Sequence, residues 1–175
     1  RIRKTVRGYK GKYYLPNILF DIDKGSNSHE WILNQARSFI FELTNHYDMD
    51  NMEIRPYFSG SGYHIVIPDL FGFKPDNKLP QHLKLTLNSH FESLKNVFDN
   101  IFDGARLIRV ANTINEKSGL YKIPLTVDEV MNCKYEDIHE LAKNQRHIKY
   151  PTFDSILKWN NKIIKAPEKA NSNKP

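Results

Sequence analysis

Residues 52–68, "MEIRPYFSGSGYHIVIP", predict two β-strands joined by a tight turn. The segments on either side of "SGSG" are rich in aromatic and β-branched residues, which favour strands, and glycine and serine favour turns. The turn carries more hydrogen-bonding groups than a hairpin needs. It therefore has two interpretations: a loose hairpin turn, or a loop that approaches a ligand closely and donates to it.

Upstream of this hairpin, residues 12–23, "KYYLPNILFDID", predict a strand whose residues Ile18, Phe20 and Ile22 share one face. Asn27 is the expected N-cap of a helix that runs to about Tyr47. The buried positions of this helix follow helical spacing and are Ile32, Ala36, Phe39, Ile40 and Leu43.

Downstream, Pro80 suits the first turn of a second helix, with Leu83, Leu87, Phe91 and Leu94 as its buried stripe. "VFDNIFDGARLIRVAN" predicts a turn into a strand, and "KSGLYKIP" predicts another strand. Thr126 and Glu129 fit a capping box, and helical pieces follow around Ile138 and Ile156. Because helices and strands alternate irregularly, the pattern favours an α+β or mixed α/β fold. We expect one domain over residues 1–165 and a disordered tail over 166–175.

The composition is that of a folded protein: of 175 residues, 39% are hydrophobic and 12% aromatic. No apolar run is long enough to span a membrane, so we expect no membrane partner. The single cysteine, Cys133, excludes an internal disulfide and a multi-cysteine zinc site, and it fits a reducing, cytoplasmic location. Because the first residue is Arg1, we expect the chain to be a fragment of a longer protein.

The net charge of +6 is concentrated at the amino terminus. Tyrosines alternate there with basic residues, which are Arg1, Arg3, Lys4, Arg7, Lys10 and Lys12. Cations neutralise phosphates and aromatic rings stack on bases, so this segment fits a nucleic-acid partner. A solvated basic terminus explains the same composition.

Three motifs, the opening turn among them, carry candidate chemistry. In "FDID", Asp21 and Asp23 are two residues apart on a strand, so both carboxylates face one side and would repel each other without a cation. Mg²⁺ or Mn²⁺ would neutralise the two carboxylates. The alternative interpretation is that both acids lie in solvent at the end of the strand and bind no ion.

The second motif is the turn itself, where hydroxyl, backbone and ring donors could contact phosphate oxygens. Its candidate nucleotide-binding residues are Ser59, Ser61, Gly62 and His64. It is not a P-loop, because the lysine and the helix that should follow are missing. The third motif, in residues 98–117, offers Asp99 or Asp103 as a further acid. It also supplies the cations Arg106, Arg109 and Lys117.

In this order, "FDID", "SGSGYH" and "FDNIFDGARLIRVANTINEKSGLYKIP" resemble the motifs of the archaeo-eukaryotic primase superfamily. In particular, the chain resembles the primase-polymerases of phages, plasmids and CRISPR-associated systems. The resemblance implies an RRM-like catalytic core with an adjoining α/β lobe. It also implies metal ligation by Asp21, Asp23 and Asp99, with Asp103 as the alternative acid.

The resemblance further implies a DNA primase or DNA polymerase that adds nucleotides from NTP or dNTP with two Mg²⁺ or Mn²⁺ ions. Ser59, Ser61, Gly62 and His64 would bind the incoming nucleotide, together with Arg106, Arg109 and Lys117. Since Arg106 and Arg109 point to opposite faces of an ideal strand, only one of them need contact it. The expected partners are a single-stranded DNA template and primer. A zinc module, a helicase or other modules would lie outside this sequence.

Two other classes stay open. One is a non-catalytic RRM-like nucleic-acid-binding module, although the basic-Gly-aromatic signature of such modules is missing. The other is a metal-dependent nuclease, which uses clustered carboxylates but needs neither the Ser/Gly/His turn nor so many cations.

Overall fold

The computed structural model describes residues 8–91, 98 and 108–150 of the chain. Strands and helices alternate irregularly along this part, and the mixed α+β class is confirmed. The elements are β1 (Asn17–Ile22), α1 (His29–Asn45), β2 (Arg55–Phe58), β3 (Tyr63–Pro68), α2 (Leu79–His90), β4 (Ile123–Pro124), α3 (Val127–Asn132) and α4 (Tyr135–Leu141).

The strands form one four-stranded sheet in the order β1-β3-β2-β4. Both β1 and β2 pair antiparallel with β3, so they run parallel to each other on either side of it. Helix α1 makes the crossover between them, as in a split β-α-β unit. The predicted β2–β3 hairpin is confirmed, and its connection consists of residues 59–62.

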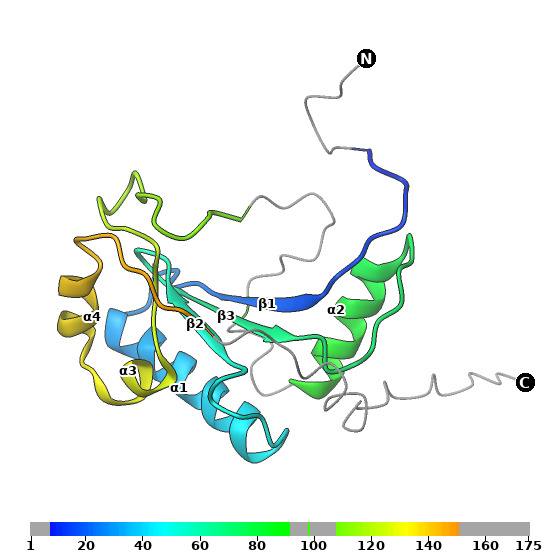
Figure 1. Ribbon diagram of the computed structural model, residues 1–175, viewed down its shortest axis with the longest axis horizontal. Helices are drawn as coiled ribbons and strands as arrows, with labels where there is room; N and C mark the ends of the chain where they lie inside the picture. Colours follow the sequence, from blue (N-terminus) through cyan, green and yellow to red (C-terminus); the bar gives the residue numbers. More distant parts are fainter. Residues whose placement is uncertain (1–7, 92–97, 99–107, 151–175) are drawn as a thin grey trace, which may run out of the picture.

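One face of the sheet packs against α1 and forms the core (Figure 1). Alternate residues of β1 are buried there, since Ile18, Phe20 and Ile22 are at most 1% exposed. Aromatic rings close this core, with Phe20 4.5 Å from Phe39 and 5.0 Å from Phe98 between ring centroids. The predicted buried stripe of α1 is confirmed at every position.

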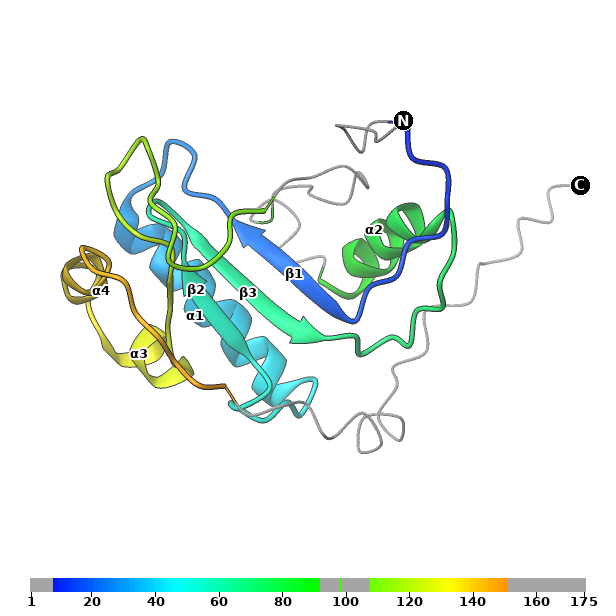
Figure 2. The same cartoon turned by 45° about the horizontal axis from the view of Figure 1, so that its top comes forward.

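Helices α3 and α4 contact α1 at one end of the molecule, and α2 lies at the other end (Figures 1 and 2). Arg37 of α1 connects it to α3 and to the residue that follows α3: its guanidinium donates to the carbonyl oxygens of Val130 and Cys133, at 2.9 and 2.6 Å. The capping box of Thr126 and Glu129 at the start of α3 is confirmed.

Three local predictions are wrong, the first two being the N-cap of α1 and a predicted strand before α3. The N-cap of α1 is Ser28, whose hydroxyl accepts from the Trp31 N–H, whereas the Asn27 side chain donates back to Lys24 in the preceding turn. The strand over "KSGLYKIP" is reduced to Ile123–Pro124, because its first half belongs to a turn in which Gly119 has φ +72°.

The stretch around Arg109 was predicted as a strand, but residues 108–112 form none. Several predicted features lie outside the described residues: Leu94, the helix around Ile156 and the tail 166–175.

Candidate active site

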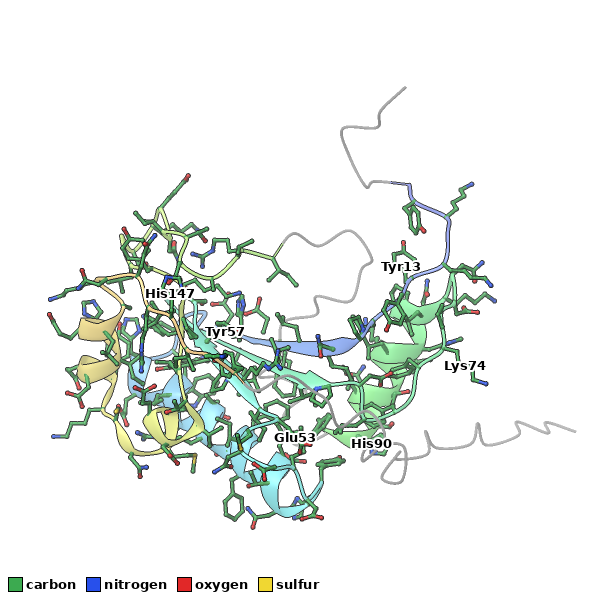
Figure 3. All side chains as sticks on the ribbon, in the orientation of Figure 1. Tyr13, Glu53, Tyr57, Lys74, His90 and His147 are labelled. Atoms are coloured by element: carbon green, nitrogen blue, oxygen red, sulfur yellow. The ribbon has the colours of Figure 1, made fainter. Side chains whose placement is uncertain are left out.

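The face of the sheet opposite α1 carries a row of polar residues. Asp21 of β1, His64 of β3 and Tyr57 of β2 are register partners across the three strands. Since strand neighbours alternate between faces, the burial of Phe20 and Ile22 against α1 turns Asp21 to the opposite side. Tyr57 is labelled on β2 in Figure 3. The sheet thus aligns an acid, an imidazole and a phenol.

Asp21 and His64 are in direct contact. The Oδ1 atom of Asp21 lies 3.2 Å from Nε2 of His64, and the two side chains are 22% and 9% exposed. Asp23 is one residue past the end of β1 and is exposed. The two acids of "FDID" therefore differ: Asp21 is fixed by a strand neighbour, and Asp23 extends from the strand end.

Lys122, just before β4, completes this arrangement. Its Nζ atom lies 2.8 Å from Nδ1 of His64 and donates to the Arg109 carbonyl oxygen at 2.8 Å. It also lies 5.3 Å from the centroid of the Tyr57 ring, within cation–π range. Burial, and after it the nearby Arg109 charge, lower the pKa of Lys122 to about 8, while Asp21 acts in the opposite direction. We call these residues the Asp21–His64–Lys122 array.

The turn 59–62 lies next to the array, since His64 is two residues beyond it. The Ser59 N–H donates to the Gly62 carbonyl oxygen, and the Ser59 hydroxyl accepts from the Gly62 N–H at 3.1 Å. Gly60 has φ +94°, which favours glycine. Among the described residues, the N–H groups of Gly60 and Ser61 have no acceptor. Two backbone donors are therefore available to a ligand.

Gly62 has a second reason to be glycine. A Cβ atom there would overlap the carbonyl oxygen of Ile22 at the end of β1. The absence of a side chain lets the hairpin approach the end of β1, and this is also where Asp23 leaves the strand.

Residues 108–122 lie over the turn (Figure 2). The Arg109 guanidinium donates through Nη2 to the Ser59 carbonyl oxygen, and the Asn115 amide donates to the same oxygen at 3.3 Å. The Nη1 atom of Arg109 is buried and has no hydrogen-bond partner in the described part of the chain. Lys117 is exposed on the same segment. Arg109 thus has both an anchored and an unused donor.

No family model matches the chain, and a search of curated proteins finds no match. The candidate site therefore rests on the geometry of its own residues.

The structure brings Asp21, His64 and Arg109 to one end of the sheet, together with the turn 59–62. Lys10 and Lys12 are exposed in the segment before β1, beside Tyr9 and Tyr13. The remaining predicted site residues lie outside the described ones: Arg3, Lys4, Arg7, Asp99, Asp103 and Arg106. Phe98, which precedes Asp99 in the sequence, forms a β-bridge with Ile22 on β1.

Sequence reasoning missed Lys122, the most buried cation of the site at 4% exposed. A signal existed: in "LYKIPL" the lysine lies between apolar residues just before a buried dipeptide. The pattern could not reveal which partner makes that burial tolerable.

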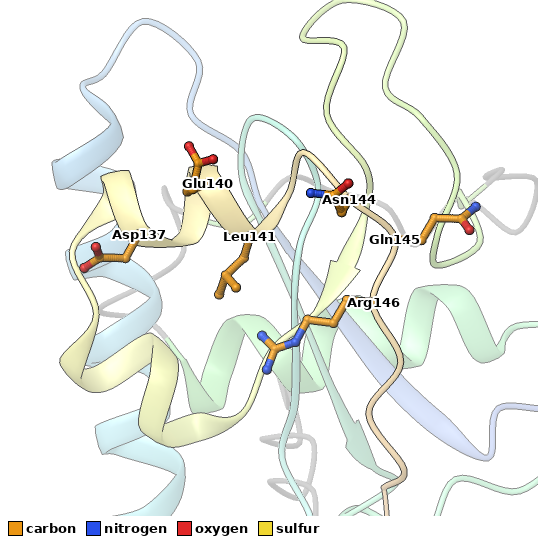
Figure 4. A pocket seen from close by; sticks show the side chains of 6 residues that line it. All are labelled: Asp137, Glu140, Leu141, Asn144, Gln145 and Arg146. Atoms are coloured by element: carbon orange, nitrogen blue, oxygen red, sulfur yellow. The ribbon is translucent and has the colours of Figure 1, made fainter.

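A separate pocket of about 570 Å³ lies between α4 and the segment that follows it (Figure 4). Its lining includes Asp137, Glu140 and Arg146, and Arg146 is paired with Glu129 at 2.6 Å. None of the predicted site residues lines it. Among the described helices, none is both long and apolar enough to cross a membrane.

Proposed function

We propose that the chain is the catalytic core of a primase-polymerase, a template-dependent nucleotidyltransferase that adds nucleotides from NTP or dNTP. The observation that carries this proposal is the 3.2 Å contact between Asp21 and His64, beside a turn that Arg109 contacts. An acid, an imidazole and several anion donors thus gather at one sheet end. Nucleotidyl transfer needs charge neutralisation and positioning more than covalent help from the protein.

The described residues supply some of the carboxylate ligands that two divalent cations would need. Asp21 keeps its Oδ2 atom and Asp23 its whole carboxylate for a ligand, and hard cations prefer such oxygens. Within residues 8–91, 98 and 108–150, no group of three potential ligands gathers. In the proposed site the ions would be held by Asp21 and Asp23 together with Asp99, or with Asp103 as the alternative, and these last two acids lie outside the described residues. When bound, such ions activate the attacking hydroxyl and neutralise the leaving pyrophosphate.

The protein's own donors suit a triphosphate. The N–H groups of Gly60 and Ser61, the free Nη1 of Arg109 and the ring of His64 would each donate to phosphate oxygens. In the reaction, the primer 3′-hydroxyl forms a bond to the α-phosphorus, the bond to pyrophosphate breaks, and one proton is released. The donors would hold the triphosphate for this displacement, and exposed Lys117 would add positive charge.

The fold supports the same proposal at a coarser level. An antiparallel sheet with one face against α1 and the other carrying polar residues suits an RRM-like core, and we extend this to the archaeo-eukaryotic primase fold. Lys10, Lys12 and the tyrosines beside them would contact the single-stranded template and primer.

A primer-extension assay tests the proposal. The protein is given a labelled primer on a DNA template with Mn²⁺ and either dNTP or NTP. Extension by single nucleotides supports the proposal. Shortening of the primer would indicate a nuclease instead, and binding without any reaction would indicate a non-catalytic module; either outcome would overturn it.

A further inference from the structure

His64 lies between two groups of opposite hydrogen-bonding capacity. Its Nε2 atom is 3.2 Å from the carboxylate of Asp21, and its Nδ1 atom is 2.8 Å from the ammonium of Lys122. The side chains come from three separate segments, and both His64 and Lys122 are buried, at 7% and 4% exposed. Both ring nitrogens of His64 are therefore in contact with charged side chains.

Only one state of the ring satisfies both neighbours. An ionised carboxylate accepts hydrogen bonds but cannot donate, so Nε2 of His64 must carry a proton. An ammonium donates but cannot accept, so Nδ1 must be unprotonated. A doubly protonated ring would direct Nδ1–H at the Lys122 ammonium, and the other neutral tautomer would mismatch both neighbours. The neutral ring with Nε2–H remains.

We propose that Lys122 is a positioning residue that holds the His64 ring as the neutral Nε2–H tautomer with that N–H directed at Asp21. In metal sites, the hydrogen bond at one histidine ring nitrogen decides whether the other nitrogen carries a proton. Here the bond from Lys122 to Nδ1 places the proton on Nε2, which becomes a hydrogen-bond donor. The consequence for catalysis rests on the proposed function: this N–H is held on the side of the acids, where it serves Asp21 in the free protein and would be shared with a phosphate oxygen of the bound nucleotide.

The surroundings of Lys122 favour this role. Its ammonium also donates to the Arg109 carbonyl oxygen at 2.8 Å and lies over the Tyr57 ring, so its position is fixed from three sides. Although burial lowers its pKa to about 8, the ammonium is still charged at neutral pH. The same backbone contact links the array to Arg109, whose side chain contacts the turn 59–62.

The tautomer can be read directly by NMR of uniformly ¹⁵N-labelled protein, because protonated and unprotonated ring nitrogens have well-separated shifts. His64→Ala identifies the His64 signals. At pH 7 we expect a protonated Nε2 and an unprotonated Nδ1 in the wild-type protein. A wild-type ring with a proton on Nδ1 would overturn the proposal without any variant.

Two variants of similar side-chain length then distinguish the loss of the Lys122 hydrogen-bond donor from a change in side-chain volume. Lys122→Gln keeps an N–H donor, so the His64 shifts should stay close to those of the wild type. Lys122→Met removes it, so Nδ1 should move toward the shift of a protonated nitrogen. Unchanged His64 shifts in folded Lys122→Met protein would overturn the proposal, with folding checked by backbone amide dispersion.

This readout needs no nucleotide, so its failure is distinct from a failure of primer extension. Where extension occurs, Lys122→Met should raise the nucleotide KM about tenfold, the size of a weakened hydrogen bond to a charged group, with a smaller change in kcat. Lys122→Gln should restore most of the KM. A fall in kcat alone, with KM unchanged in both variants, would contradict a positioning role toward the nucleotide.

Discussion

Asp21 Oδ1 and His64 Nε2 lie 3.2 Å apart because the two residues are register partners on the neighbouring strands β1 and β3. Lys122, from the segment just before β4, reaches the other ring nitrogen at 2.8 Å. The sheet thus positions the acid and the imidazole, while a connection outside it supplies the cation. A substitution of Asp21 or Lys122 therefore alters the hydrogen bonding of His64, which contacts both.

Asp21→Asn should lower the rate of primer extension by at least about a hundredfold, since outer-shell partners of metal ligands alone carry about 10–100-fold effects. The fold should persist, because the amide oxygen can still accept from His64. Single-turnover extension with Mn²⁺ measures the rate, and thermal unfolding checks the fold. Glu136→Gln, at an exposed position of α4, is the control and should extend at the wild-type rate. Full activity in Asp21→Asn would exclude Asp21 as a metal ligand.

His64→Ala should raise the nucleotide KM by about 10–100-fold, because a hydrogen bond to a charged acceptor contributes about 1.5–3 kcal/mol. The affinity for a primer-template should change far less, since no described contact links His64 to the basic segment before β1. Steady-state extension gives the KM, and fluorescence anisotropy with labelled DNA gives the Kd. If DNA binding weakens more than the KM rises, His64 belongs to the DNA interface.

The sequence predicted the local elements that depend on spacing alone. The stripe of α1, the alternation of β1 and the capping box at Thr126 all follow from periodicity or from residues three apart. The N-cap of α1 was misplaced by one residue because Asn27 and Ser28 are both good caps. Sequence does not tell which side chain the preceding turn uses, and in the structure Asn27 donates to Lys24.

The candidate site was predictable only in part, because its contacts depend on strand register and tertiary structure. Asp21 and His64 were found as motif residues, but their contact depends on strand register. Lys122 was missed because its burial is tolerable only beside His64 and the Arg109 carbonyl, which lie 58 and 13 residues away in the sequence. The role of Gly62 also depends on tertiary structure, since the atom that excludes a side chain belongs to β1.

Gly62→Ala should lower the free energy of unfolding by about 1–3 kcal/mol, the usual cost of overpacking, because the new methyl group would overlap the Ile22 backbone. Urea unfolding measures the change. Gly11→Ala is the matched control: its methyl group would meet the ring of Tyr9, which is 50% exposed and can move away. Equal stability of the two variants would show that β1 and the hairpin do not approach as closely as the structure describes.

Lys122→Met should change how stability depends on pH. Burial lowers the pKa of Lys122 from 10.5 to about 8 in the folded protein, so the folded state releases this proton at a lower pH than the unfolded state. Below about pH 8 Lys122 is protonated in both the folded and the unfolded state, so the free-energy cost of burying its charge does not change with pH. As the pH rises above 8, the unfolded state binds more protons, and the wild-type protein gains stability relative to Lys122→Met.

Between pH 8 and 9.5 this relative gain should be about 1.5 kcal/mol, from about 1.4 kcal/mol per pKa unit. Burial also raises the pKa values of Tyr57, Tyr63 and Tyr150, which destabilises the fold as tyrosines ionise at higher pH. Up to pH 9.5 these phenols stay largely protonated in both folded proteins, since loss of the Lys122 cation beside Tyr57 can only disfavour its ionisation further, so the term cancels in the difference. Urea unfolding at several pH values measures the difference, and Lys149→Met, at an exposed position, should show none of the gain. Parallel pH curves for the wild type and Lys122→Met would mean that the folded protein does not perturb the ammonium of Lys122.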